Sequence, residues 1–196
     1  MTAALSNERL KNGNESSLMR ALVNRLKNDE TLMLAYQQGD THAFDSLYAR
    51  HKDGLFAFLY RSCQRQAIVE ELAQDAWIGV IKSASSYKPE ARFKTWLYQI
   101  AHNRMIDYWR RRDNQHDSLS DVPEPATDAD ASEESTALLM AAIAQLPREQ
   151  CNTLLLQQQG FSLRDIAQIT DCAEETAKSR LRYARTQLRD ALRHER

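Results

Sequence analysis

Residues 162–185 read SLRDIAQITDCAEETAKSRLRYAR and predict a short helix, a tight turn and a second, longer helix. On the second helix, apolar residues recur at steps of four and three, at Ala177, Leu181, Ala184, Leu188 and Leu192. One residue later, cations recur at the same steps, at Lys178, Arg182, Arg185, Arg189 and Arg193. Such a helix can pack on a core and present cations outward. We therefore expect a helix-turn-helix whose second helix meets DNA phosphates and base edges.

The alternative for this stretch is a plain helical hairpin whose arginines are only solvated. The basic stripe is continuous and nearly free of acids, which favours a DNA target. Glu174 and Glu175 stand at the start of the second helix. They can complement the helix dipole or accept a hydrogen bond from a cytosine amino group, and both roles stay open.

The bulk composition bounds the class of protein. The chain has 196 residues, a net charge of −1, 42% hydrophobic residues and few Gly and Pro, which favours an all-α protein of two small domains. No apolar run approaches the roughly 20 residues that span a bilayer, and no signal peptide is expected. Cys63, Cys151 and Cys172 are far apart, so neither a zinc site nor a disulfide framework is indicated and a reducing cytoplasm fits.

Charge and helix signals divide the chain into four parts. We expect a flexible arm at 1–27, a helical domain at 28–112, an acidic linker at 113–136 and a helix-turn-helix domain at 137–196. The linker carries eight Asp and Glu, no Lys or Arg, and two prolines, which is typical of an extended tether. We also expect that the tether lies against basic surfaces of the free protein and weakens DNA binding.

Aromatic and basic residues interleave in YKPEARFKTWLYQIAHNRMIDYWRRR, residues 87–112. Rings of this kind stack on unpaired bases in single-stranded DNA, or else they are half-buried core, and both readings stay open for Trp96, Tyr98, Tyr108 and Trp109. The cluster at 110–112 ends a predicted helix, so it can compensate the helix dipole or contact phosphate.

The predicted helix at 67–82 has a wide apolar face that suggests contact on two sides. Gln74, Asp75 and Trp77 lie on this otherwise apolar helix, which suits a protein partner better than solvent. The five histidines show no metal spacing, and we find no Gly-rich phosphate loop, nucleophile motif or carboxylate pair with a base. We therefore expect no enzyme activity, no cofactor and no metal.

Four motifs now occur in order: ELAQDAW at 71–77, FKTWLYQIAHNRMID at 93–107, QLPREQ at 145–150 and KSRLRYAR at 178–185. Together the chain from Thr31 to Arg193 resembles an extracytoplasmic-function (ECF) sigma factor of the sigma-70 family. The resemblance implies binding to core RNA polymerase, recognition and melting of specific promoters, and control by an anti-sigma factor. It implies promoter DNA as partner, both as duplex and as the single non-template strand, and no membrane insertion.

The resemblance also implies roles for particular residues. Those that bind core polymerase would be Leu72, Gln74, Asp75 and Trp77. Those that melt the minus-ten element, with a base flipped from the stack, would be Tyr87, Lys88, Phe93, Trp96, Asn103, Arg104, Arg110, Arg111 and Arg112. Those that read the minus-thirty-five element would be Glu175, Thr176, Lys178, Ser179, Arg180, Arg182 and Arg185.

One departure concerns the recognition helix. The family commonly shows Gly-Thr-Val-Lys-Ser-Arg, whereas here a glutamate replaces the glycine and Ala177 the valine, so the promoter sequence cannot be carried over. The runner-up interpretation is a one-component helix-turn-helix regulator that acts without polymerase as an obligate partner. The arginines and rings of 87–112 argue against it, because a ligand-binding domain has no need for them. A third interpretation is an adaptor that keeps the fold without promoter opening.

Overall fold

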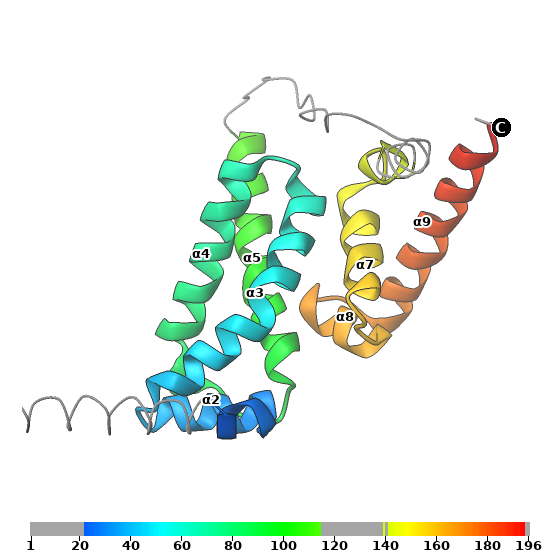
Figure 1. Cartoon of the computed structure of the whole chain (residues 1–196). Coiled ribbons are helices and arrows are strands. Elements are labelled where there is room, and N and C mark those ends of the chain that lie inside the picture. Colours follow the sequence, from blue (N-terminus) through cyan, green and yellow to red (C-terminus); the bar gives the residue numbers. More distant parts are fainter. Residues whose placement is uncertain (1–21, 115–138, 140, 195–196) are drawn as a thin grey trace, which may run out of the picture.

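The computed structural model describes residues 22–114, 139 and 141–194, and every regular element among them is helical, which confirms the all-α expectation (Figure 1). The elements are α2 (Asp29–Gln37), α3 (Thr41–Cys63), α4 (Gln66–Lys82), the 3₁₀ turn η1 (Ala84–Ser86), α5 (Phe93–Asn114), α7 (Arg148–Gln158), α8 (Leu163–Ile169) and α9 (Glu174–His194). Figure 1 shows α2 to α5 in one group and α7 to α9 in a second. The expected linker lies, from residue 115 on, outside the described residues.

Local signals set the helix boundaries in the first domain. The Asn28 side chain accepts a hydrogen bond from the Thr31 amide at 2.8 Å and caps α2, and Asp40 caps α3 by accepting from the His42 amide at 3.1 Å. Gly39, with φ of +96°, makes the sharp turn between these helices, a conformation that favours glycine. These caps and the glycine turn set where the first helix ends and the second begins.

The first domain has one apolar core formed by α2 to α5. Its fully buried side chains include Leu47, Phe58, Val69, Leu97 and Met105. Helices α4 and α5 approach closely at Gly79, where a Cβ atom would lie only 2.7 Å from Cγ2 of Ile100. The glycine therefore permits the close packing that orients α5 against α4.

The second domain is a helix-turn-helix made by α8 and α9 and backed by α7. Ser162 and Asp165 form the predicted capping box, in which the Ser162 side chain accepts from the Asp165 amide and the Asp165 carboxylate accepts from the Ser162 amide. Asp171, at φ of +49°, forms the turn before α9. The apolar stripe of α9 is buried at Ala177, Leu181 and Ala184, whereas Leu192 is exposed.

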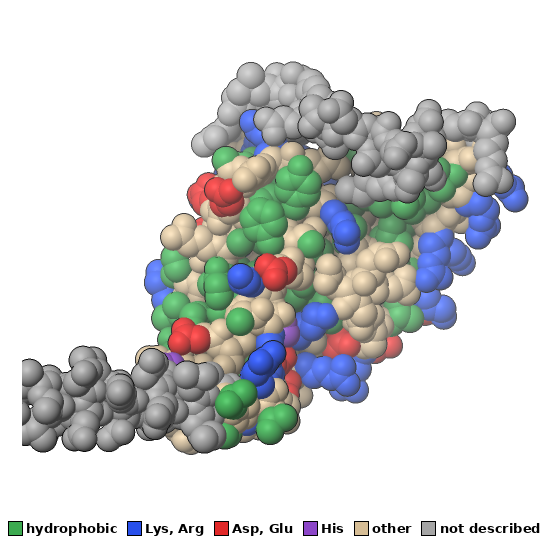
Figure 2. Space-filling view, in the orientation of Figure 1, with side chains coloured by type: hydrophobic (Ala, Val, Ile, Leu, Met, Phe, Trp, Pro, Cys, Tyr) green, Lys and Arg blue, Asp and Glu red, His purple; other side chains and the backbone are tan. Residues whose placement is uncertain are grey.

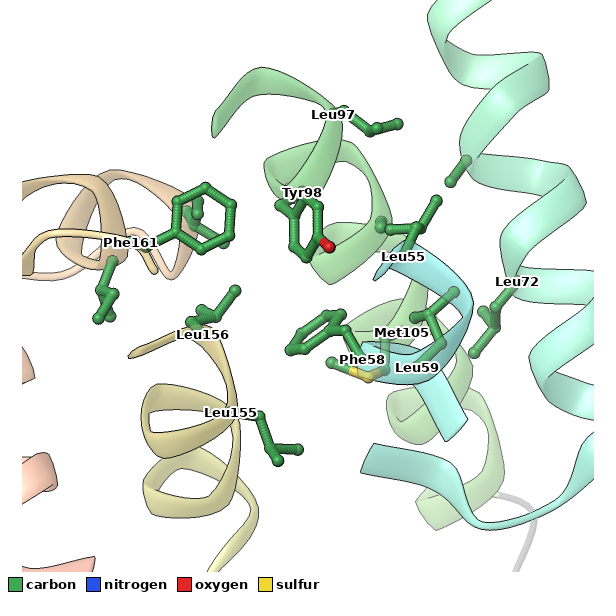
Figure 3. Close-up of a cluster of buried hydrophobic side chains, with 14 of the residues drawn as sticks. Leu55, Phe58, Leu59, Leu72, Leu97, Tyr98, Met105, Leu155, Leu156 and Phe161 are labelled. Carbon is green, nitrogen blue, oxygen red and sulfur yellow. The ribbon is translucent and has the colours of Figure 1, made fainter. Parts of the chain in front are cut away.

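The two domains pack against each other along α5 and α8 and along α3 and α7. Figure 3 shows Tyr98 and Phe58 of the first domain facing Phe161 and Leu156 of the second. Polar contacts flank this apolar seam, and Lys94 Nζ donates to the Gln159 carbonyl at 2.6 Å. The described parts of the two domains thus form one continuous core.

Three details differ from the sequence prediction. Residues 22–26, which we expected to belong to a flexible arm, are helical, and the carbonyls of Asn24, Arg25 and the following Lys27 accept hydrogen bonds from the Arg50 guanidinium. Helix α5 continues to Asn114, two residues beyond its expected end, and so includes Asp113, which pairs with Arg148 at 2.9 Å. Pro147, which its residue type would place at the first helical position, is the N-cap residue of α7.

Candidate nucleic-acid interface

Helix α9 presents most of the predicted duplex-reading residues on its outer face. Glu175, Thr176, Lys178, Arg182 and Arg185 are exposed, and Ser179 and Arg180 are half-buried. Figure 2 shows a row of Lys and Arg side chains along α9 at the right edge of the molecule. The cations stand beside the buried apolar stripe, so the helix can face a polyanion without losing its core contacts.

Several of these side chains already have partners within the chain. Lys178 pairs with Glu175 at 3.0 Å, one turn apart, and Arg185 donates to the Gln157 side chain at 2.8 Å. Arg180 pairs with Glu149 at the start of α7. Arg182 makes no ion pair among the described residues and lies over the Tyr183 ring at 5.1 Å. Its guanidinium can therefore meet a phosphate without first breaking an ion pair to a described residue.

The loop at 83–92 and the start of α5 contain an aromatic cluster. The Tyr87 ring lies 4.9 Å from Trp96 and 6.2 Å from Phe93. Phe93 is completely buried and Tyr87 is only 5% exposed. Burial, together with the carboxylates of Glu30 and Asp29, raises the pKa of Tyr87 to about 12. Both rings lie beneath the surface in this conformation, and their direct contact with nucleic acid stays a prediction.

Trp96 is the partly exposed ring of that cluster. The sequence left open whether the other rings of this segment are free to stack on bases or belong to the core. Tyr98 and Trp109 are buried core residues, and Tyr108 is half-buried. Five of the polar residues predicted to meet the minus-ten strand are exposed on the loop before α5 and along α5 itself: Lys88, Asn103, Arg104, Arg110 and Arg111. Arg112 is half-buried. Arg110 pairs with Asp107 at 2.8 Å. One accessible ring among exposed cations is an arrangement that suits single-stranded DNA.

A groove between α3 and α4 holds part of the predicted polymerase-binding set. Trp77 is 7% exposed and packs edge-on against Tyr48 at 5.0 Å and against Phe44 at 5.8 Å. Gln74 is exposed and Asp75 is half-buried, whereas Leu72 is buried in the core, so its contact with a partner stays a prediction.

Sequence reasoning missed four apolar or aromatic residues that line the groove, namely Tyr48, Phe56, Ile78 and Ile81. All four have exposed surface. Tyr48 and Phe56 have the spacing of core positions on an amphipathic helix, so no signal in the sequence marked them as exposed. For Ile78 and Ile81 the wide apolar face predicted at 67–82 was the available signal.

Among the described residues, no group of three or more His, Cys, Asp and Glu side chains could hold a metal ion. No helix of the described chain is both long and apolar enough to cross a membrane.

Taken together, the geometry defines a two-domain helical protein with a helix-turn-helix and a separate aromatic-basic helix. Comparison with protein families agrees with this division. Residues 47–115 match the sigma-70 region 2 family, and residues 136–188 match the sigma-70 region 4 family. The matches cover α5 with most of α3 and α4, and the helix-turn-helix domain.

Similar proteins come from several bacteria. The chain is 31% identical over 180 residues to the ECF RNA polymerase sigma-E factor of Haemophilus influenzae, covering 84% of this chain and 95% of that one. It is 29% identical over 163 residues to the ECF RNA polymerase sigma factor SigM of Mycobacterium tuberculosis, covering 83% of each chain. The solved structure of the sigma factor RpoE with the anti-sigma factor NepR from Bartonella quintana superposes with a TM-score of 0.67 at 25% identity, covering 78% of this chain and 98% of that one.

The chain therefore belongs to the ECF sigma factors of the sigma-70 family. Its function is that of this family, to direct RNA polymerase to promoters.

Proposed function

We propose that this sigma factor uses three separate surfaces. The groove between α3 and α4 binds core polymerase, Trp96 with the exposed polar residues of α5 captures the melted non-template strand, and α9 reads the upstream duplex element. The observation that carries this assignment is the segregation of side chains: an apolar groove, an aromatic-basic helix and a basic helix occupy three different places on one chain. Each surface has the chemistry of a different partner.

The groove fits a protein partner. Its exposed residues Ile78 and Ile81 are apolar, and Gln74 supplies polar contact at its edge. Isolated exposed apolar residues are ordinary on protein surfaces, but a contiguous apolar groove rimmed by polar residues is typical of a docking site. Nucleic acid has no apolar helix face that could bind in this groove. Core polymerase is therefore the partner that suits the groove.

The strand-capturing surface centres on Trp96, since that ring offers a face for a base while Asn103, Arg104 and Arg110 are exposed for hydrogen bonds and phosphate contacts. Base stacking on a ring contributes roughly 1–3 kcal/mol for each base. Tyr87 and Phe93 support Trp96 from beneath and hold its orientation.

The duplex-reading surface is the outer face of α9. The N-terminal part of a recognition helix meets base edges, which assigns Glu175, Thr176 and Ser179 to bases and Arg182 and Arg185 to phosphates. The ion pair between Glu175 and Lys178 must loosen if either side chain contacts a base.

We also propose an anti-sigma factor as a regulating partner and the cytoplasm as the place of action. A structural relative is a sigma factor held by an anti-sigma factor, and core polymerase is a cytoplasmic partner. The protein itself supplies binding and strand separation, and the chemistry of RNA synthesis belongs to the polymerase.

Transcription with purified bacterial core polymerase, this protein and fragmented genomic DNA from its host tests the proposal. RNA 5′ ends that appear only with the protein, downstream of two shared and spaced sequence elements, are the expected result. No new starts, together with sequence-specific shifting of duplex DNA by the protein alone, would favour the one-component regulator instead.

Two variants test the docking groove in the same assay. Ile78→Glu places a charge in the groove and should weaken binding of core polymerase at least tenfold. Leu34→Glu is the matched control, because Leu34 on α2 is as exposed as Ile78 at 36% and lies outside the groove. If both variants bind core polymerase equally well, the groove is not part of the polymerase interface.

A further inference from the structure

Helix α2 contacts both ends of the loop that precedes α5. It packs against η1 and against α5, and its Leu32 and Met33 are completely buried in the domain core. The region 2 family match begins at residue 47, so α2 lies outside it. The three surfaces of the proposed function lie on other helices, and none of them includes α2.

At the start of the loop, Gln37 makes two hydrogen bonds. Its Nε2 donates to the Ala84 carbonyl at 2.6 Å and to the Tyr87 carbonyl at 2.9 Å. These carbonyls belong to the first residue of η1 and to the residue that follows it, so one side-chain amide fixes the path of the backbone into the loop. Gln37 is the last residue of α2, and its side chain crosses to a segment 47 to 50 residues further along the chain.

At the end of the loop, Glu30 binds the first turn of α5. Its Oε1 accepts a hydrogen bond from the Phe93 amide at 3.0 Å. That amide is one of the N–H groups that have no partner inside the helix, and a carboxylate there is also favoured by the helix dipole. Glu30 and Gln37 are seven residues apart, about 10 Å along the helix axis. Helix α2 thus holds the two loop ends at a set spacing.

The loop between these anchors is closed on itself and presents its tip to solvent. The Tyr87 hydroxyl donates to the Ala91 carbonyl at 3.1 Å, and Lys88, Pro89 and Glu90 between them are exposed. The Tyr87 ring meanwhile packs on Trp96. Any shift of the loop therefore moves Lys88 and the ring beneath Trp96 together.

We propose that α2 is the positioning element of the strand-capturing surface, with Glu30 and Gln37 as positioning residues that fix the loop at 83–92 for single-stranded DNA. This inference rests on the proposed function of Trp96 and Lys88. It predicts that capture of the melted strand depends on two side chains that do not touch DNA.

The test uses holoenzyme assembled from core polymerase and the full chain. The probe is a single-stranded oligonucleotide with the non-template minus-ten sequence of a promoter found by the transcription experiment. Gln37→Ala and Glu30→Ala should each weaken binding of this strand about fivefold to tenfold, as expected for loss of one or two anchoring hydrogen bonds. Affinity for core polymerase and for minus-thirty-five duplex should stay unchanged.

Conservative variants separate positioning from mere folding. Gln37→Lys keeps a donor for the two carbonyls and Glu30→Gln keeps an acceptor for the amide, so both should retain most of the strand binding. Gln38→Ala is the matched control, because Gln38 is exposed and its side chain makes no hydrogen bond to any described residue. Thermal unfolding of each variant reports whether the domain stays folded.

Two results would overturn the inference. If Lys88→Ala weakens strand binding while the alanine variants at 30 and 37 bind like the wild type, the loop captures the strand without help from α2. If Lys88→Ala and Trp96→Ala also bind normally, the strand-capturing assignment itself is wrong and the role of α2 falls with it.

Discussion

The ring of Tyr98 on α5 lies 4.8 Å from the ring of Phe161, edge to face, and joins the two domains (Figure 3). Beside this pair, Lys94 Nζ lies over the Phe161 ring at 4.7 Å and the Thr95 hydroxyl donates to Asp165 at 3.1 Å. These contacts occupy the flank of α5 next to Trp96. The helix to which we assign strand capture is therefore partly covered by the domain to which we assign duplex reading.

This closed arrangement does not suit simultaneous contact with both promoter elements. The elements are named for positions roughly 25 base pairs apart, which is about 85 Å at 3.4 Å for each base pair. Packed domains that share a continuous core cannot span that distance. The Tyr98–Phe161 contact must therefore open before the protein can occupy a whole promoter.

Phe161→Ala should shift the free protein toward the open arrangement. Removing the ring deletes the contacts with Tyr98 and Lys94, which hold the seam together. We expect a larger radius of gyration by small-angle X-ray scattering and several-fold tighter binding of promoter duplex by the free chain. Phe44→Ala, the same truncation on α3 away from the seam, should leave both unchanged. An unaltered radius of gyration for Phe161→Ala would show that the seam rests on other contacts.

Acid should weaken the seam through His102. This side chain is buried between the domains, and desolvation, reinforced by the Arg180 guanidinium and opposed by Glu149, lowers its pKa from 6.5 to about 4. Between these two values the opened or unfolded chain binds more protons than the closed chain. Stability is therefore complete above pH 6.5 and is lost as the pH falls toward 4, by on the order of 3 kcal/mol at most.

Urea denaturation at pH 7.5, 5.5 and 4.5 measures this loss, and His102→Gln should flatten the dependence within that window. Partial burial raises the pKa values of the Asp29 and Asp165 carboxyls, but hydrogen bonds and nearby cations outweigh it, so both pKa values lie below the ordinary 3.8. These two carboxylates therefore lose their contribution to stability only below pH 3.8. An identical pH profile in wild type and His102→Gln would remove His102 as the cause.

Local features of the fold could be predicted from the sequence because each is decided within a few residues. Asn28 caps α2, Gly39 turns the chain, and Ser162 with Asp165 forms a capping box, all as expected from their residue types. The buried stripe of α9 follows from a period that a helix imposes by itself.

Burial of individual rings could not be predicted in the same way. Phe93 and Trp96 are three residues apart in one motif, yet the first is completely buried and the second is partly open. That difference depends on Glu30 and Tyr87 and on how α2 meets α5, which no local pattern encodes. The contact between Tyr98 and Phe161 joins two residues that are 63 positions apart and belong to different domains, and no local pattern in the sequence predicts it.

Gly79→Ala should destabilise the first domain by about 1–3 kcal/mol. On a solvent-exposed face of a helix, Gly→Ala would stabilise the fold by up to about 1 kcal/mol. At position 79, however, the new Cβ would lie 2.7 Å from Cγ2 of Ile100. Urea unfolding measures the cost. In an Ile100→Ala background, which removes the clashing methyl group, Gly79→Ala should cost much less. The same cost in both backgrounds would mean that another neighbour causes the strain.

Arg182→Ala should weaken binding of promoter duplex and make that binding less dependent on salt. A phosphate contact releases condensed counterions, so losing one contact should reduce the slope of log affinity against log salt by about 0.9. Fluorescence anisotropy across a salt series measures the slope. Arg65→Ala, an equally exposed cation on the first domain, is the control. An unchanged slope would show that Arg182 does not contact a phosphate.

Trp96→Ala should impair promoter opening more than any later step. The ring is the accessible stacking surface of its cluster, and loss of one stacked base should reduce open complex on linear duplex roughly tenfold or more. Permanganate reactivity of thymines in the minus-ten element measures opening. On a template melted in advance, much of the activity should return, because part of the cost of separating the strands has been removed. Tyr60→Ala, which truncates an exposed ring on α3, should open duplex normally. Equal loss on duplex and melted templates would instead indicate that Trp96→Ala damages the folded domain.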